Sequence, residues 1–174
     1  MPRQNISDIS KISFDDELNV LNLSDNPLTS LVGMPELPHL VSLDLSNTQL
    51  TSFEGIPRLN SLSVLDIRGT PLNKVPTIRI TALILFPRLE NFNGSKIPFS
   101  DKAKAKEYPA QSAFLIRKGW IPPQSPPSDQ DLIQISRDLA KDTPKKPTEA
   151  PKRIVSQREY LTAILNEQNR KLSS

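Results

Sequence analysis

The feature that most constrains this chain is an internal repeat with a period of 22 residues, whose first three copies begin at Leu18, Leu40 and Leu62. A repeat of this length predicts an array in which each copy forms one structural unit and neighbouring units share a continuous core. The apolar columns that stay in phase over the three copies are Leu18/Leu40/Leu62, Leu21/Leu43/Leu65, Leu23/Leu45/Ile67, Leu28/Leu50/Leu72, Leu31/Phe53/Val75 and Met34/Ile56/Ile78.

Each copy contains one short stretch with the alternation of a β-strand. In the first copy, Leu21 and Leu23 are apolar and Asn22 between them is polar. Because successive side chains of a strand point to opposite faces, both leucines are expected to face the core and Asn22 to face outward. A single amphipathic helix through the repeats is disfavoured, because prolines interrupt it at Pro27, Pro35, Pro38, Pro57 and Pro71.

The two ends of the array depart from the regular repeat. Subtracting 22 from apolar positions of the first copy gives Ile6, Ile9 and Ile12, so residues 1–17 are predicted to form a half-repeat cap without a strand. A fourth strand is predicted from Leu89, because the third copy carries five extra residues. These residues, within 77–86, predict a turn or two of helix in place of a tight loop.

The spacing Leu-x-x-Leu-x-Leu-x-x-Asn-x-Leu resembles the repeat of the leucine-rich repeat family, with Asn26 at the asparagine position. The resemblance implies an α/β fold: a short solenoid with parallel strands on its concave side and loops or helical turns behind them. It also implies that the Asn26 amide satisfies backbone groups at the turn. Thr48 and Thr70 stand at this position in the next two copies, so the asparagine ladder is expected to be degenerate.

The closing segment, residues 77–108, resembles the C-terminal cap of an intracellular class within this family. The features that carry the resemblance are a helix ending at Phe86-Pro87, the turn Asn93-Gly94 and a charged helix opened by Ser100-Asp101. The class includes proteins of the tubulin-binding cofactor E, phosphatase-one regulatory subunit, spliceosomal leucine-rich protein and axonemal dynein light chain types. The resemblance covers about residues 5–120.

The sequence divides into a half-repeat cap over 1–17, about four repeats over 18–99, a helical cap over 100–121 and a proline-rich tail over 122–174. Within the helical cap, a helix over 111–118 is expected to end at Gly119, with Trp120 packed as a lid on the last repeat. From Pro122 onward, seven of the 17 prolines fall within about thirty residues, which predicts an extended chain. Two short helices, near 128–140 and 156–172, interrupt this tail.

Polar residues that follow the strand pattern form columns across the predicted concave face. Asp44 and Asp66 are expected to stack about 5 Å apart, the spacing of neighbouring strands. Two interpretations stay open: a docking site for a basic or amide-rich partner segment, and ordinary solvated strand residues. The predicted docking residues are Asn22, Ser24, Asp44, Ser46, Asp66, Arg68, Asn91 and Asn93, and Ser95 is expected to extend the last column.

The two predicted tail helices carry apolar stripes that need a partner, because helices of this length are marginal alone in water. We expect them to dock on another protein, with folding back onto the repeats as the alternative. The residues predicted to make these contacts are Leu132, Ile135, Leu139, Tyr160, Leu161, Ile164 and Leu165.

Composition argues against catalysis. The chain has no cysteine and one histidine, His39, so neither a thiolate metal site nor a histidine-based catalytic triad is expected. We expect no cofactor, no metal and no small-molecule substrate. The net charge of +3 is too close to neutral to indicate direct nucleic-acid binding, and no apolar run is long enough for a signal peptide or a membrane span.

These observations predict a non-catalytic adaptor in a multi-subunit assembly inside the cell, with protein partners on the solenoid and on the tail. The resemblance and the long tail favour a cytoplasmic, cytoskeletal or axonemal setting with tubulin or axonemal proteins as partners. A nuclear RNP scaffold and a phosphatase regulatory protein are the alternatives.

Overall fold

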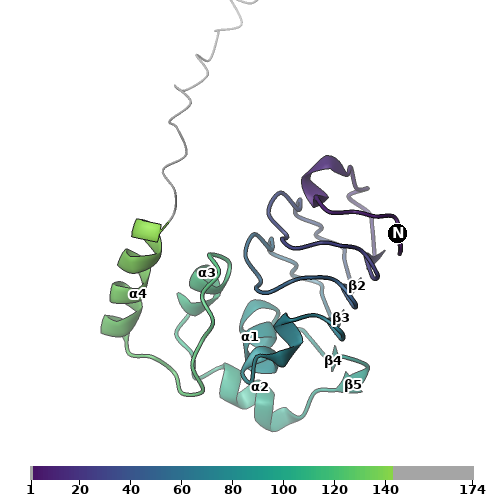
Figure 1. The fold of residues 1–174 in the computed structure, drawn as a ribbon. Helices are drawn as coiled ribbons and strands as arrows, with labels where there is room; N and C mark the ends of the chain where they lie inside the picture. Colours follow the sequence, from purple (N-terminus) through teal and green to yellow (C-terminus); the bar gives the residue numbers. More distant parts are fainter. Residues whose placement is uncertain (1, 143–174) are drawn as a thin grey trace, which may run out of the picture. The chain divides into compact units, whose positions relative to one another are not determined.

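The computed structural model describes residues 2–142, and a compact unit spans Met1–Ala140. Its sheet has five strands in the order β1-β2-β3-β4-β5, and the first four strands are parallel. The strands are β1 (Val20–Asn22), β2 (Ser42–Asp44), β3 (Val64–Asp66), β4 (Asn91–Phe92) and β5 (Ser95–Lys96) (Figure 1). The predicted parallel strands, one per repeat, are confirmed.

The core follows the repeat register. Leu21, Leu43 and Leu65 are strand neighbours, and Phe92 continues the row in β4. All four side chains are buried, while the residues on either side of each leucine are more exposed. Because each unit covers the apolar face of the next, the core is a stack of leucine layers closed at both ends by non-repeat residues.

The N-terminal segment covers one end of the core. It contains the 3₁₀ helix η1 (Ile9–Lys11), which Asp8 caps by accepting a hydrogen bond from the backbone of Ser10 at 3.0 Å. Ile9 is 1% exposed and Ile6 packs against the core beside it. No strand occurs in residues 2–17, so this segment covers the first leucine layer without adding a strand to the sheet.

Asn26 performs the role that the repeat pattern predicted. Its amide donates to the carbonyls of Leu23 and Ser24 at 2.9 and 3.1 Å. Its carbonyl oxygen accepts from the backbone N–H groups of Gln4 and Ile6 at 2.9 and 3.0 Å, which ties the N-terminal cap to the first repeat.

The two threonines that stand at the asparagine position make fewer of these contacts. Thr48 Oγ1 donates to the Leu45 carbonyl at 2.8 Å, and Thr70 Oγ1 donates to the Ile67 carbonyl at 2.7 Å. A hydroxyl has one donor hydrogen where an amide has two. The ladder is therefore degenerate, as the sequence predicted.

The third repeat ends differently from the first two. After the 3₁₀ helix η2 (Leu72–Lys74), the extra residues form the helix α1 (Ile78–Leu85), as predicted. The fourth strand is shorter than predicted, because the chain reverses at Asn93 and Gly94, whose φ angles are +54° and +78°. Positive φ at both central residues is typical of a tight hairpin turn. Ser95 consequently pairs antiparallel with Phe92, and its predicted place in a concave column is wrong.

The helical cap consists of α2 (Phe99–Ala105) and α3 (Ser112–Ile116). The chain leaves α3 through Gly119 (φ +92°), whose N–H bonds to the Ile116 carbonyl at 2.9 Å, while the Trp120 N–H bonds to the Leu115 carbonyl at 3.0 Å. This pair of bonds is the Schellman helix ending, which favours glycine at that position. Trp120 is half-buried and packs against the core.

The compact unit continues past residue 122, where the sequence predicted the extended tail to begin. Thr77 Oγ1 donates to the Pro122 carbonyl at 2.9 Å, and the Tyr108 hydroxyl donates to the Pro123 carbonyl at 2.6 Å. Proline lacks an N–H donor but keeps its carbonyl acceptor. The proline pair therefore attaches to the repeat domain, and the predicted boundary is misplaced.

The helix α4 (Asp129–Asp142) confirms the first helix predicted in the tail (Figure 1). Ser128 and Asp131 cap it reciprocally: the Asp131 N–H bonds to Ser128 Oγ at 3.2 Å, and the Ser128 N–H bonds to Asp131 Oδ2 at 3.0 Å. Leu132 is 4% exposed within the compact unit. The expectation that Leu132 is presented to another protein is therefore wrong, and the alternative of folding back holds for this residue.

Other predictions about the tail lie outside the described residues. These are the second helix, over 156–172, and its contact residues Tyr160, Leu161, Ile164 and Leu165. Within residues 2–142, none of the helices combines the length and the apolar character that crossing a bilayer requires.

Candidate functional site

The strand register brings most of the predicted concave-face residues together. Asn22 is the register partner of Asp44, and Asp44 is the register partner of Asp66. We call Asn22, Asp44 and Asp66 the acidic row. A second row, two residues earlier along each strand, holds Val20, Ser42, Val64 and Asn91. Val20 is 63% exposed, so the face offers an apolar contact beside its acidic row. We call the strand residues of these two rows, together with Ser46 and Arg68, the concave face.

Two residues of the acidic row make the same local hydrogen bonds. Asn22 Oδ1 accepts from the Ser24 N–H at 2.9 Å and from the Ser24 hydroxyl at 2.7 Å. Asp44 Oδ1 accepts from the Ser46 N–H at 2.9 Å and from the Ser46 hydroxyl at 2.6 Å. An amide and a carboxylate thus build the same turn, and the turn itself does not require a negative charge.

Asp66 is occupied differently, because arginine replaces serine two residues later. Arg68 Nε lies 2.9 Å from both carboxylate oxygens of Asp66, and Arg68 Nη2 also contacts Oδ2. Burial alone would raise the pKa of Asp66, but hydrogen bonds from the Arg68 side chain and backbone outweigh it and hold that pKa below its ordinary value. Asp66 therefore stays ionised, and Arg68 balances its charge.

Several predicted site residues serve the fold. Ser24 is 7% exposed, so it is buried and not outward-facing as predicted. Asn93 Oδ1 accepts from the Ile67 N–H at 2.9 Å, and Asn93 Nδ2 donates to Asn73 Oδ1 at 2.7 Å. Asn93 thus links the hairpin of β4 and β5 to the third repeat. Asn91 remains half-buried in the outward row.

Asp44 is the concave-face carboxylate that can accept further hydrogen bonds. Its Oδ1 atom accepts the two bonds from Ser46, and within residues 2–142 its Oδ2 atom has no hydrogen-bond partner. Among the same residues, no cluster of three or more His, Asp or Glu side chains could hold a metal ion. The chemistry that this face offers is recognition by hydrogen-bond acceptors and negative charge.

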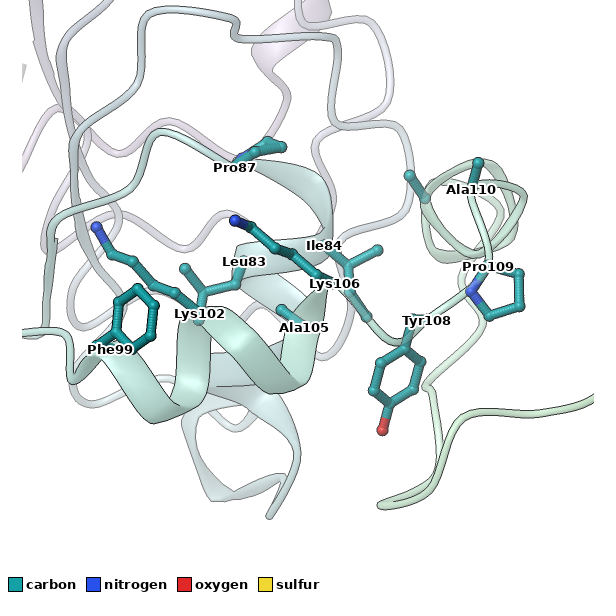
Figure 2. Close-up of a pocket in the computed structure, with 11 residues that line it drawn as sticks. Leu83, Ile84, Pro87, Phe99, Lys102, Ala105, Lys106, Tyr108, Pro109 and Ala110 are labelled. Atoms are coloured by element: carbon teal, nitrogen blue, oxygen red, sulfur yellow. The ribbon is translucent and has the colours of Figure 1, made fainter.

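A second candidate surface was not predicted from the sequence. An apolar cavity of about 260 Å³ lies where α1, α2 and the start of α3 meet, and we call it the cap groove (Figure 2). Leu83 and Ile84 of α1 and Ala105 of α2 line it, and Phe99 at the start of α2 is 81% exposed. The signal available in the sequence was an aromatic residue at the start of a helix that otherwise reads as charged. The other residues lining the groove are Pro87, Lys102, Lys106, Tyr108, Pro109, Ala110 and Ala113.

A second cavity, of about 510 Å³, lies between α3 and α4. Phe114 and Ile133 line it and are 58% and 53% exposed. Its charged lining residues, Asp129 and Arg137, have opposite signs. It therefore gives no electrostatic indication of the ligand it would accept.

Tyr108 links the cap groove to the proline pair and makes stability depend on pH. Burial, and secondarily the charge of Glu107, raise the pKa of Tyr108 above its ordinary value. The unfolded phenol ionises near pH 10, so the unfolded state loses its proton first as the pH rises. Stability from Tyr108 is therefore complete below about pH 10 and declines as the pH rises through the folded-state pKa.

The variant Tyr108→Phe is expected to cost about 1 kcal/mol near neutral pH, because the bond to the Pro123 carbonyl is lost. Above about pH 10 its stability should decline less steeply than that of the parent chain. Urea unfolding followed by circular dichroism on both sides of pH 10 measures this difference. Equal slopes for the two chains would contradict the role assigned to Tyr108.

Comparison with known proteins gives a family match for part of the chain. Residues 16–58 match the family model described as Leucine Rich repeats (2 copies). No curated protein matches the chain.

Solved structures that match the chain include the Drosophila melanogaster SNF/U2A′ complex and the Chaetomium Mex67:Mtr2 subunits. The first match has 24% identity and a TM-score of 0.37, and it covers 53% of this chain and 69% of the other. The second has 23% identity and a TM-score of 0.41, and it covers 56% of this chain and 71% of the other.

Proposed function

We propose that this leucine-rich repeat protein is a non-catalytic adaptor whose concave face docks a segment of a partner protein. The observation that carries the proposal is the spare acceptor capacity of Asp44. Because Asn22 builds the same turn without a charge, the carboxylate of Asp44 brings to the surface a negative charge that this turn does not need. The complementary partner segment is rich in lysine, arginine or side-chain amides, which donate hydrogen bonds.

The neighbouring row of the concave face supports the same proposal. Val20 is 63% exposed and Val64 is half-buried, so an extended or helical partner segment has apolar surface to cover next to the acidic row. Apolar contact provides the affinity of such interfaces, while charge complementarity favours the correct partner and register. Arg68 offers the one positive group on this face and would pair with a partner carboxylate or stay with Asp66.

The test replaces both acids by their isosteric amides, Asp44→Asn with Asp66→Asn. An amide keeps the oxygen that accepts the turn hydrogen bonds, so the variant is expected to fold within about 1 kcal/mol of the parent, the usual scale of an ion pair whose arginine is exposed to solvent. We expect recovery of the docked partner, measured by quantitative mass spectrometry after affinity purification from the native cell, to fall by about tenfold.

A matched control removes two charges elsewhere. Glu36 and Glu54 are exposed in loops of the repeats, away from the strands, so Glu36→Gln with Glu54→Gln changes the net charge equally. This control is expected to retain every partner. If the concave-face variant also retains every partner, the proposed docking face is wrong.

The tail is the proposed second attachment point. Its capping box at Ser156 and Glu159 and its apolar residues Leu161, Ile164 and Leu165 predict an amphipathic helix that docks in a groove of another protein. The same proposal includes Ile135 and Leu139 of α4, both half-buried.

The cellular setting we propose is a microtubule-associated or axonemal assembly. The support is the likeness of the closing segment, residues 77–108, to the cap of cofactor-type leucine-rich proteins, together with the long tail and its basic stretch over 141–158. Fluorescence microscopy of the tagged protein tests it. Co-localisation with microtubule structures is expected, and accumulation in the nucleus would favour an RNP scaffold instead.

A further inference from the structure

We propose that the cap groove is a second docking site, which binds an acidic amphipathic helix of a partner protein. The proposal is independent of the concave face, because the groove is built by other elements: α1, α2 and the start of α3. Its occupant is defined by chemistry: bulky apolar side chains on one face, flanked by aspartate or glutamate.

The residues that line the groove differ sharply in how exposed they are. Leu83 on the floor is 4% exposed and belongs to the core, whereas Phe99 at the rim is 81% exposed. A buried aromatic side chain covers about 150–250 Å² of surface, so an exposed ring beside an apolar cavity is a large unused contact. Aromatic residues placed in this way are typical anchors of protein interfaces.

The size of the cavity favours a partner side chain over a free small molecule. Pockets that enclose drug-sized ligands measure about 300–1,000 Å³, and the cap groove measures about 260 Å³. Its lining includes Leu83, Ile84, Pro87 and Ala113, which offer no side-chain hydrogen-bond donors or acceptors. Such a surface suits the apolar face of a helix lying in a groove.

The rim of the groove carries positive charge. Lys102 and Lys106 line the groove, and Figure 2 shows both amines extending from α2 on the side where Pro87 lies. Within residues 2–142, neither lysine has a hydrogen bond or ion pair to its amine. Asp101 of α2 is paired with Arg79 at 2.6 Å and does not neutralise them. Glu107 follows Lys106, so the two lysines outnumber the acid next to them and the rim stays positive. Two unpaired cations beside an apolar floor complement a partner helix with carboxylates along the edge of its apolar face.

The chain's own segment 156–172 is not the proposed occupant of the groove. That segment carries three basic and two acidic residues, so it does not complement a basic rim.

The experiment selects a phage-displayed library of random helical peptides on the full chain. Enriched peptides are expected to combine leucine, phenylalanine or tryptophan on one face with an excess of aspartate and glutamate. Fluorescence anisotropy then gives the dissociation constant of the selected peptides. Phe99→Ala is expected to weaken binding by about tenfold or more, and Lys102→Glu with Lys106→Glu by a similar factor.

Matched variants separate the groove from general effects. Phe114→Ala removes another exposed aromatic residue outside the groove, and Lys96→Glu with Lys104→Glu makes the same change in net charge on residues that do not line it. Both are expected to bind the peptides like the parent chain. Because Phe99 is exposed, Phe99→Ala should keep the thermal unfolding midpoint, which circular dichroism checks.

Three results would overturn the proposal. They are enrichment of basic or neutral peptides, binding that survives Phe99→Ala, and a self-association that Phe99→Ala abolishes in sedimentation, since the occupant would then be a second copy of the chain. Selection on the Asp44→Asn, Asp66→Asn variant is expected to enrich the same acidic peptides. Failure of the concave-face proposal would therefore leave this one standing.

Discussion

Replacing Asn26 by alanine lowers the free energy of unfolding by about 4 kcal/mol, because several buried backbone groups lose their partner together. The Asn26 side chain makes four hydrogen bonds with Gln4, Ile6, Leu23 and Ser24. Each buried polar group left without a partner costs about 1–3 kcal/mol, and water reaches only the bonds at the half-exposed N-terminal cap. Urea denaturation measured by circular dichroism gives the difference.

The control for this variant lies one repeat further along the chain. Thr48→Val keeps the shape of the side chain and removes the bond from Thr48 Oγ1 to the Leu45 carbonyl. One such bond is worth about 1 kcal/mol. If the two variants lose equal stability, Asn26 does not join the N-terminal cap to the first repeat in the way the hydrogen bonds indicate.

Replacing Gly55 by alanine is expected to cost about 4 kcal/mol, from two causes that add. Gly55 has a φ of +79°, a conformation that costs other residues about 1–2 kcal/mol. A Cβ at this position would also lie 2.5 Å from the backbone N and Cα atoms of Val32 in the preceding repeat. Those backbone atoms are held by their own repeat, so relieving the overlap moves two loops apart, and overpacking of this kind costs about 1–3 kcal/mol.

Gly94 provides the matched control. Its φ of +78° is nearly the same, but the atoms that a Cβ at this position would meet belong to the flexible Arg68 side chain, at 3.7 Å or more. Gly94→Ala is therefore expected to cost only the conformational part, about 1–2 kcal/mol. Equal losses in thermal unfolding for the two variants would show that the close approach to Val32 does not limit the packing of adjacent repeats.

Where periodicity carried the information, the sequence predicted the structure closely. The columns of Leu21, Leu43 and Leu65 predicted three parallel strands and their register. The cap residue Ile9 was found by extending the same period upstream. A repeat makes this possible because each position is observed several times within one chain, so the apolar face stands out from chance.

The predictions from the sequence were wrong where the structure depends on contacts that occur only once in the chain and not in every repeat. The tail boundary was misplaced because proline content indicates a missing donor and says nothing about the carbonyls of Pro122 and Pro123 that accept bonds from Thr77 and Tyr108. Ser95 was placed in a concave column because the alternation continues through a turn that only the positive φ angles of Asn93 and Gly94 reveal.

The candidate site was predictable in part. The strand pattern placed Asp44 and Asp66 side by side, but whether each carboxylate is free or occupied depends on the residue two positions later, serine in one repeat and arginine in the next. The cap groove could not be read from any single segment, because Leu83, Phe99 and Ala113 come from three helices that meet only in the folded chain.

The hairpin of β4 and β5 also bears on how the protein behaves in concentrated solution. A sheet edge with unpaired backbone groups invites strands of other molecules to add, and such growth leads to aggregation. Here the last parallel strand is covered by β5, which is two residues long, runs in the opposite direction and carries the exposed Lys96. A strand of another molecule would meet a short, charged edge at which the parallel pairing has ended. The turn at Asn93 and Gly94 therefore disfavours polymerisation at this end of the array.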